Sequence, residues 1–321
     1  MIHFEPFPYD HAASLVGLRP WDVSRSPLLL YQAFNTAIER YHLSHAVLGI
    51  DIYNLEAETL GCRVAEPDGN ASPLISGPIC ASHAEIQQLK LEFDSASRFP
   101  WLLETAQHLQ QNHPACAVKI PITGPFTLAG HLLGLNDLLC DCLLRPGETR
   151  DTLDHLASLL MEFIRRASER NLEVTIFESS ASPPMLSPGL FRNVLKPVLQ
   201  PLFDEAELIQ GRRPALIMGG NTLPVLQQIV ELHPSYMICP IETDQPKFVS
   251  RLVELSGEIH LRVNMRPEVF THDSAQEALQ EASRTRQLAA LCKISSIGTI
   301  LPFESIPAVV DAVSEFTASR Q

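Results

Sequence analysis

The sequence has few basic residues and no long hydrophobic run. Lysine and arginine number 24 against 37 aspartates and glutamates, so the net charge is -13 at pH 7 and the pI is near 5.4. This balance argues against a nucleic-acid or anionic-membrane partner, because either needs a basic surface. No stretch reaches the roughly 18 apolar residues of a membrane span, and the opening MIHFEPFPYDH lacks the basic and apolar regions of a signal peptide. We therefore expect a cytoplasmic protein.

Metal-binding spacings are also lacking. The 7 cysteines show no zinc-ribbon spacing, and the 12 histidines form no HxH, HExxH or HxC pair. Reduced thiols are the simplest interpretation of the odd cysteine count. His131 is the histidine retained as a site candidate, because it lies in a predicted helix that follows a Gly-Pro strand exit. His260 lies inside a predicted strand and is expected to be a hydrogen-bonded interior residue.

Short apolar runs alternate with helix-length segments along the chain. The runs cover residues 46–50, 116–121, 173–178, 214–219, 236–242, 259–264 and 292–297. The run at 46–50 has no period-two alternation, which is typical of a strand covered on both faces. Strands that alternate with helices predict βα units and a parallel sheet. With an eighth strand expected in the N-terminal third and no GxGxxG turn, the pattern favours a (β/α)8 TIM barrel over an open doubly wound sheet.

We expect one domain over residues 1–321, because no linker or break in composition divides the chain. Residues 1–45 are predicted to form an N-terminal helical arm packed on the outside of the barrel, with 28–41 as its main helix. Residues 62–81 are interpreted as an excursion loop or a small hairpin. Further helices are predicted at 98–112, 126–144, 150–170, 188–209, 223–232, 247–255, 274–291 and 306–318.

Polar residues fall where the predicted strands end. In a barrel of this type catalytic groups come from the carboxyl ends of the strands. The residues at these positions are Asp51, Thr123, Glu178 with Ser179, Asn221 with Thr222, Glu242 with Asp244, and Asn264 with Arg266. We expect them to line one acidic pocket.

Two interpretations of the segment after residue 50 remain open. Asp51, Asn54 and Glu56 either face a site, or Asp51 or Asn54 caps the next helix and Glu56 is a solvated carboxylate of its first turn. On the first interpretation, replacing Asp51 by asparagine abolishes the reaction and leaves thermal stability nearly unchanged.

Alternatives also remain for three other positions. Asn221 follows two glycines and could be a turn residue or a helix cap. Arg266 could anchor a carboxylate in the pocket or pair with Glu268 outside it. Glu178 ends an apolar strand, where an unpaired carboxylate would be costly to bury, and this favours a role in the pocket.

Several segments resemble the uroporphyrinogen decarboxylase superfamily. They are GPFTLAGHLLG (124–134), IFESSASPPMLSPGLF (176–191), MGGNTLPVL (218–226), VNMRPEVF (263–270) and GTILPFESIPAVVDAV (298–313). The block EAETLG (56–61) is similar to the corrinoid and coenzyme M methyltransferase branch, whereas GIDI (49–52) resembles the strand of the decarboxylases that carries their substrate-binding aspartate. The resemblance covers nearly the whole chain and implies a TIM barrel that is often dimeric.

The chain departs from both branches at residues that carry chemistry. The resemblance places the zinc ligands of the methyltransferases, a His-x-Cys pair and a later cysteine, at Ile217, Gly219 and Gly298, which cannot bind a metal. Zinc is therefore not expected. Against the decarboxylases, Asp51 and Ser179 match the aspartate and serine, while His131 and Gly298 stand at the tyrosine and histidine positions. Their arginine-rich N-terminal segment is missing.

Three functional hypotheses follow from the resemblance. The preferred one is zinc-independent methyl transfer between a small molecule and a corrinoid on a partner protein, with Glu178 or Glu242 as acid or base. The second is decarboxylation of a tetrapyrrole or related acid, with Asp51 stabilising developing charge. The third is a non-catalytic ligand-binding barrel. No tightly bound cofactor is expected, and a homodimer is one assembly that the resemblance allows.

The predicted site has two groups of residues. The catalytic candidates are Asp51, His131, Glu178, Ser179 and Glu242. The substrate-binding candidates are Asn54, Glu56, Asn221, Asn264 and Arg266.

Overall fold

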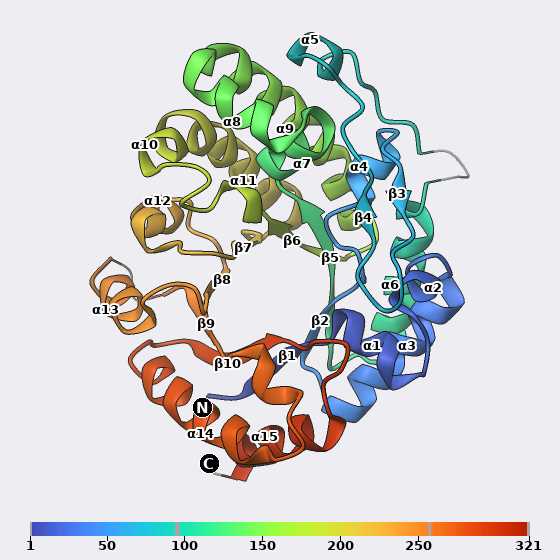
Figure 1. Cartoon of the computed structure of the whole chain (residues 1–321), viewed down its shortest axis with the longest axis vertical. Coiled ribbons are helices and arrows are strands. Elements are labelled where there is room, and N and C mark those ends of the chain that lie inside the picture. Colours follow the sequence, from blue (N-terminus) through green and yellow to red (C-terminus); the bar gives the residue numbers. More distant parts are fainter. Residues whose placement is uncertain (1, 94–96, 256–257, 320–321) are drawn as a thin grey trace.

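Eight parallel strands form a ring enclosed by helices (Figure 1). The computed structural model describes residues 2–93, 97–255 and 258–319. Hydrogen bonds link the strands in the order β1-β10-β9-β8-β7-β6-β5-β2, and β1 and β2 complete the ring (Figure 1). This confirms the predicted (β/α)8 barrel. The strands are β1 (Phe4–Phe7), β2 (His45–Val47), β5 (Ala117–Thr123), β6 (Glu173–Phe177), β7 (Ala215–Ile217), β8 (Tyr236–Cys239), β9 (His260–Asn264) and β10 (Ser295–Ile300).

The helices follow the predicted segments closely, with breaks at three places. The expected helix at 223–232 begins with a 3-10 turn, η3 (Leu223–Val225), before α12 (Leu226–Val230). The expected helix at 126–144 is divided at Gly134, whose φ of 95° no regular helix adopts, into α7 (Pro125–Leu133) and α8 (Leu135–Leu144). A π-helical stretch, η2 (Phe191–Leu195), separates α10 (Pro188–Leu190) from α11 (Lys196–Gln210). The other helices are α1 (Tyr9–Leu15), α2 (Pro20–Ser24), α3 (Pro27–Tyr41), α4 (Leu55–Thr59), α5 (His83–Ile86), α6 (Phe99–Asn112), α9 (Pro146–Ser168), α13 (Gln245–Leu255), α14 (Ala275–Ala289) and α15 (Pro307–Ser319).

The N-terminal segment differs in part from the predicted outer arm. Helices α1 to α3 are present, but Phe4–Phe7 before them is the barrel strand β1, paired in parallel with β10 from Phe4 opposite Ile297 to Phe7 opposite Ile300. Its sequence, FEPF, contains a proline that lacks a backbone donor, so it gives a weak strand signal. The proline is tolerated because β1 hydrogen-bonds to β10 on one side.

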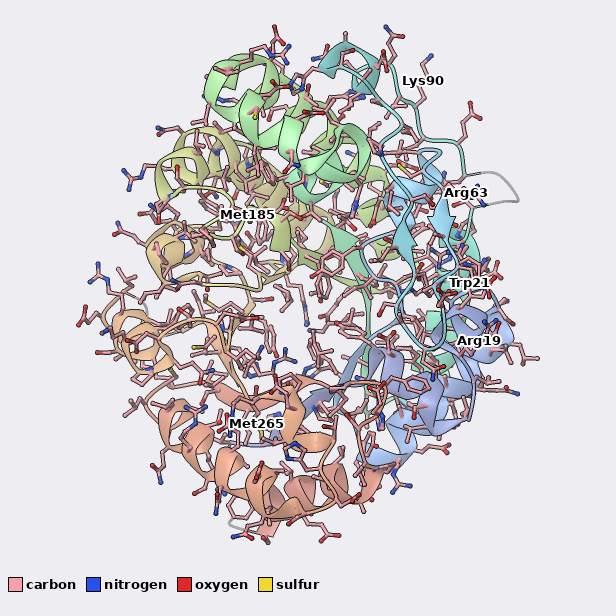
Figure 2. All side chains as sticks on the ribbon, in the orientation of Figure 1. Arg19, Trp21, Arg63, Lys90, Met185 and Met265 are labelled. Atoms are coloured by element: carbon pink, nitrogen blue, oxygen red, sulfur yellow. The ribbon has the colours of Figure 1, made fainter. Side chains whose placement is uncertain are left out.

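A two-stranded hairpin lies beside the barrel, as one of the sequence interpretations predicted. It consists of β3 (Val64–Ala65) and β4 (Leu74–Ile75), paired antiparallel. Arg19, at the start of α2, forms a 2.9 Å ion pair with Glu66 of this hairpin. Figure 2 shows Arg19, Trp21 and Arg63 on this same flank of the molecule.

Apolar side chains fill both the barrel and the layer between strands and helices. The interior cluster includes Phe7, Val47, Phe177, Ile217 and Ile238, and the larger cluster packs the helices onto the strands. Side chains project into the ring from the surrounding strands (Figure 2). In the described ranges no single helix is long and apolar enough to cross a membrane. Only α7 and α8 taken together meet that length and composition, with a bend of 112° between them.

Candidate functional site

Two adjoining cavities lie at the carboxyl ends of the barrel strands. The first has a volume of about 460 Å³ and is bounded by the segments after β1, β2 and β6, by α7 and by the hairpin. The second, of about 160 Å³, is bounded by β1, β9 and the ends of β6 to β8 and β10. Tyr53, Ser179 and Ile300 line both. The location agrees with the general placement of active sites in such barrels.

Asp51 lines the first cavity but is already paired with arginine. Arg98, at the start of α6, donates from Nη1 to Oδ1 at 2.9 Å and from Nη2 to Oδ2 at 2.7 Å. Arg25 Nη2 lies 3.5 Å from Oδ2, and Glu58 in turn pairs with both arginines. Both Asp51 and Arg98 are buried. The first cavity is therefore not acidic at Asp51, contrary to the prediction, because Arg25 and Arg98 neutralise the charges of Asp51 and Glu58.

Asn54 and Glu56 are buried and mainly hold backbone segments together. Asn54 lines the first cavity and donates from Nδ2 to the carbonyl of Pro73 at 2.8 Å, which fixes the hairpin; its side chain makes no cap to α4. Glu56 accepts from the amide and hydroxyl of Thr123 at 3.1 and 2.7 Å. Burial raises the pKa of Glu56 to about 7. Glu56 is thus neither the solvated carboxylate of one interpretation nor part of either cavity wall.

Glu178 points into the start of α7 instead of into a cavity. It accepts from the amides of Phe126 and Thr127 at 3.0 and 2.7 Å and from the Thr127 hydroxyl at 2.5 Å. A Cβ at Gly124 would lie 2.3 Å from its Oε2, so glycine is what lets the helix approach. This corrects the expected pocket role: the free amides of the helix N-terminus are the partners that make burial tolerable. Burial raises the pKa of Glu178 to about 7, against the opposing effect of the hydrogen bonds from Thr127 and Phe126.

His131 and the hydroxyl pair of Tyr53 and Ser179 are among the polar residues that line the first cavity, together with Asp10. His131 is on α7, and its Nε2 is buried without a hydrogen-bond partner among the described residues. Burial lowers the pKa of His131, so the imidazole is neutral at pH 7. The hydroxyls of Tyr53 and Ser179 are 2.7 Å apart. The amide of Gly219 donates to Ser179 Oγ at 3.4 Å. The arrangement can therefore take up a proton at His131.

Glu242 and Asn264 line the second cavity, whereas Asn221 and Arg266 lie outside both. Glu242 is exposed at its mouth. Asn221 is exposed and accepts from Thr243 Oγ1 at 2.8 Å. The Arg266 guanidinium pairs with Glu281, with Nε 3.6 Å from Oε2. Arg266 therefore pairs outside the cavities, as one of the two alternatives predicted. Its partner is Glu281 of α14 and not Glu268.

Sequence reasoning overlooked three residues of the site. Arg98 holds Asp51, Tyr53 pairs with Ser179, and Arg262 is fully buried in the wall of the second cavity. The sequence did contain a signal for Arg262, because a charged residue between Leu261 and Val263 is unusual in an apolar strand. Arg98 had no such local signal, because its partner is 47 positions away.

The positions at which the resemblance places zinc ligands come together around Arg262. Ile217 and Gly219 line the second cavity with it, and a Cβ at Gly298 would lie 2.9 Å from Arg262 Cδ. Neither an isoleucine nor a glycine side chain can ligate a metal, so these residues do not fit zinc. Within the described ranges no group of three or more His, Cys, Asp or Glu side chains is placed to hold a metal ion.

Comparison with known proteins points to methyltransferases. No family model matches the chain. Over 170 residues it is 23% identical to a methylated-thiol–coenzyme M methyltransferase of Methanosarcina mazei. That match covers 50% of this chain and 46% of the relative, so it spans about half the length of the curated relative.

One solved structure shares the fold over nearly the whole chain. A methyltransferase from Methanosarcina mazei superposes with a TM-score of 0.81 at 15% identity, covering 99% of this chain and 92% of that one. A GH18 chitinase from Pseudoalteromonas aurantia aligns over 87% of this chain and 95% of that one, with a TM-score of 0.46 at 10% identity. The sequence match and the shared barrel confirm the predicted resemblance to the uroporphyrinogen decarboxylase superfamily, on the side of its methyltransferases.

Proposed function

We propose that this chain is a zinc-independent methyltransferase that acts on a small thiol or thioether and exchanges the methyl group with a corrinoid on a partner protein. The observation that carries the proposal is His131, which lines a cavity of about 460 Å³ at the barrel mouth and whose buried Nε2 has no hydrogen-bond partner among the described residues. The likeness to a methylated-thiol–coenzyme M methyltransferase supports the same reaction class.

His131 is the proton acceptor in this proposal. Methylation of a thiol would form a carbon–sulfur bond from an electron pair of the sulfur, while the bond between the methyl carbon and its carrier breaks and leaves its electron pair on the carrier. The S–H bond also breaks, its electron pair stays on sulfur, and its proton must pass to a base. Burial lowers the pKa of His131, so the ring is neutral before the step and Nε2 has a lone pair that can accept the released proton. A thiolate attacks far better than a thiol, so removing this proton accelerates the step.

The other polar groups of the first cavity position the small molecule. The hydroxyls of Tyr53 and Ser179 lie where its polar atoms can hydrogen-bond, and the buried side chains of Ile50 and Ile52 give the cavity an apolar wall for its alkyl part. A corrinoid, when present, supplies or takes up the methyl group. In this proposal the corrinoid is bound by the partner protein, so this chain needs only an accessible cavity mouth at which the corrinoid can approach the small molecule.

The decarboxylase hypothesis has less support from the site. It needs Asp51 to accept hydrogen bonds from a nitrogen-bearing ring. Both Asp51 oxygens already accept from Arg98, and Arg25 lies close by. Asp51 therefore mainly joins the segment after β2 to the start of α6 at the cavity wall. No specific observation among the described residues favours decarboxylation or a purely non-catalytic role.

The test is methyl transfer from methylcobalamin to small thiols by the purified protein. We expect the methyl thioether to accumulate, detected by mass spectrometry, with a matching loss of methylcobalamin absorbance. His131→Asn should lower the rate about 100-fold, the usual lower range for a proton-transfer group. His108→Asn, an exposed histidine of α6, is the matched control and should be unchanged. Absence of product with every thiol, or full activity in His131→Asn, would contradict the proposal.

A further inference from the structure

A further cavity lies at the amino ends of the barrel strands, opposite the mouth. Its volume is about 220 Å³, and we call it the floor pocket. Five strands each contribute their first residue to its lining, and these residues are His45 of β2, Glu173 of β6, Ala215 of β7, Tyr236 of β8 and His260 of β9. Lys119 of β5, which lies opposite Glu173 in the sheet register, also lines it. The floor pocket shares no lining residue with the first cavity, so His131 lies outside it.

Four rings in the lining are joined by edge-to-face contacts. The ring centroids of Phe7 and His45 are 6.0 Å apart, those of His45 and Tyr236 are 6.0 Å apart, and those of Tyr236 and His260 are 4.9 Å apart. The interplanar angles are 87°, 73° and 75° in the same order. Aromatic rings prefer this geometry to direct face-to-face stacking, and a further ring can join such a set. The lining therefore favours a ligand that carries an aromatic ring.

A buried carboxylate holds three of these rings in place. The oxygens of Glu5 lie 3.4 Å from His45 Nε2 and 3.6 Å from His260 Nε2, and the Tyr236 hydroxyl donates to Glu5 at 3.1 Å. His3 Nε2 lies 2.8 Å from the same carboxylate, and its hydrogen-bonding interaction with Glu5 raises the pKa of His3. The rings are thus oriented before any ligand arrives, and His3, which does not line the floor pocket, can offset the charge of Glu5.

The described lining contains more cations than carboxylates. Lys119 Nζ lies 3.5 Å and Arg212 Nη1 lies 2.5 Å from the oxygens of Glu173. Among the described lining residues Glu173 is the only carboxylate, and one carboxylate cannot neutralise two cations. Lys119 makes the longer contact, and its ammonium group has three donors to offer. A ligand with a single negative charge completes the balance.

The size and the apolar surface of the floor pocket narrow the ligand further. Its volume of about 220 Å³ corresponds to about seven water molecules, which suits one ring with a carboxylate and is too small for a nucleotide. Val47, Ala215 and Ile217 belong to the interior apolar cluster and also line the pocket. Burying the ring against these side chains is favourable.

We propose that the floor pocket is a second ligand site, and that it binds a small aromatic carboxylate with its ring among the aromatic side chains and its carboxylate on Lys119 and Arg212. The inference goes beyond the proposed function and does not rest on it, because the residues assigned to methyl transfer lie outside this pocket. The amino end of a barrel ordinarily serves stability. A purely structural role, with no ligand bound, is therefore the outcome that the experiments must separate from binding.

Calorimetric titration of the full chain with three probes tests the ligand class. The probes are benzoate, the neutral benzyl alcohol, which has the same ring, and acetate, which has the carboxylate alone. We expect one saturable benzoate site, with an affinity about tenfold or more above that for either other probe, because only benzoate uses both the ring wall and the cations. Lys119→Gln should remove the advantage of benzoate over benzyl alcohol. Lys247→Gln is the matched control, because Lys247 is exposed and pairs with Asp244 outside the pocket, and it should bind as the wild type does.

A second variant tests where the ring binds. Ser235 is exposed and lines the floor pocket, so the side chain of Ser235→Phe can fill the space without removing a charge. We expect this variant to lose both benzoate and benzyl alcohol binding, with a melting temperature close to that of the wild type. Ser235→Ala, which leaves the space open, should bind both probes normally.

Several results would overturn the proposal. They are the absence of saturable benzoate binding, an equal affinity for benzoate and either other probe, and wild-type benzoate binding in Lys119→Gln or in a folded Ser235→Phe. If Ser235→Phe does not fold, Lys119→Gln decides alone. The methyl-transfer assay with His131→Asn is independent of these results, so the two proposals can fail separately.

Discussion

Asp51 and Arg98 show how a neighbour from a distant part of the chain sets the role of a carboxylate. Both are buried, and two hydrogen bonds of 2.9 and 2.7 Å join them. Arg25 and Glu58 complete the cluster. The two charges of each sign balance, which is the condition under which buried ions are tolerated. Asp51 therefore holds α6 and the segment after β2 together at the wall of the first cavity.

Asp51→Asn should destabilise the protein strongly. The amide cannot replace the bidentate acceptor, so the buried Arg98 guanidinium loses its partner and the free energy of unfolding falls by about 3–5 kcal/mol. This reverses the sequence-based expectation that stability would be nearly unchanged. Asp22→Asn is the control, because Asp22 pairs with Arg19 at the surface and should cost about 0–1 kcal/mol. Denaturant unfolding checks both variants, and equal small losses would contradict the prediction.

Helix α7 depends on Glu178, the residue that follows strand β6. Pro125 at its first position lacks an amide hydrogen, and the next two amides donate to Glu178. Gly124 provides the close approach between helix and strand end. The same helix carries His131 into the first cavity. Glu178 is therefore a structural support for the candidate site, through the placement of α7.

Glu178→Gln should change how stability depends on pH. Burial raises the folded-state pKa of Glu178 to about 7, above the roughly 4.3 of an unfolded glutamate. Ionisation then favours the unfolded state, so this residue's contribution to stability is full below about pH 4 and is lost as the pH rises to about 7. Glutamine resembles the protonated form. The unfolding free energy of the wild type minus that of the variant should therefore fall across this range, by up to about 3 kcal/mol.

Urea unfolding at intervals between about pH 4.5 and 7.5 measures this difference. Glu205→Gln, on the exposed surface of α11, controls for the loss of one negative charge, and its curve should run parallel to the wild type. A difference for Glu178→Gln that stays flat or rises with pH would show that the three donors keep the carboxylate ionised in the folded protein.

The whole barrel is closed by its first strand. β1 covers the edge of β10, and its Phe7 ring lies against Arg262. At the amino-terminal end of the barrel, Glu5 of β1 lies 2.8 Å from His3 Nε2 and 3.4 Å from His45 Nε2, and it accepts from the Tyr236 hydroxyl at 3.1 Å. One short strand thus links residues of β2, β8 and β10.

Removing residues 1–7 should abolish cooperative folding. An outer arm could be removed at modest cost, but the loss of β1 opens the ring, exposes the β10 edge and leaves the interior cluster without Phe7. Thermal unfolding followed by circular dichroism should show no sharp transition, in contrast to the full chain. A truncated protein with a cooperative transition near that of the full chain would contradict this prediction.

The sequence determined the fold class and most of the elements. Apolar runs and helical spacing are local properties, and strands β5 to β9 and helices α3, α6, α9, α14 and α15 lie where those patterns predict them. Strand β1 was not predicted, because its four residues include a proline and a glutamate and are too few to show a strand periodicity. The placement of polar residues at strand ends was also readable, because parallel strands bring their carboxyl ends to one side.

Only the tertiary structure decided what those polar residues do. Asp51 meets Arg98 across 47 positions, and Glu178 meets Thr127 across 51. No local pattern encodes such pairs, because the partner depends on how the ring closes and which helix end comes within hydrogen-bond distance. The same closure leaves the two Nη atoms of the buried Arg262 without a hydrogen-bond partner among the described residues. Whether a charged side chain is paired depends on its neighbours in the folded structure, and the order of residues along the chain does not specify those neighbours.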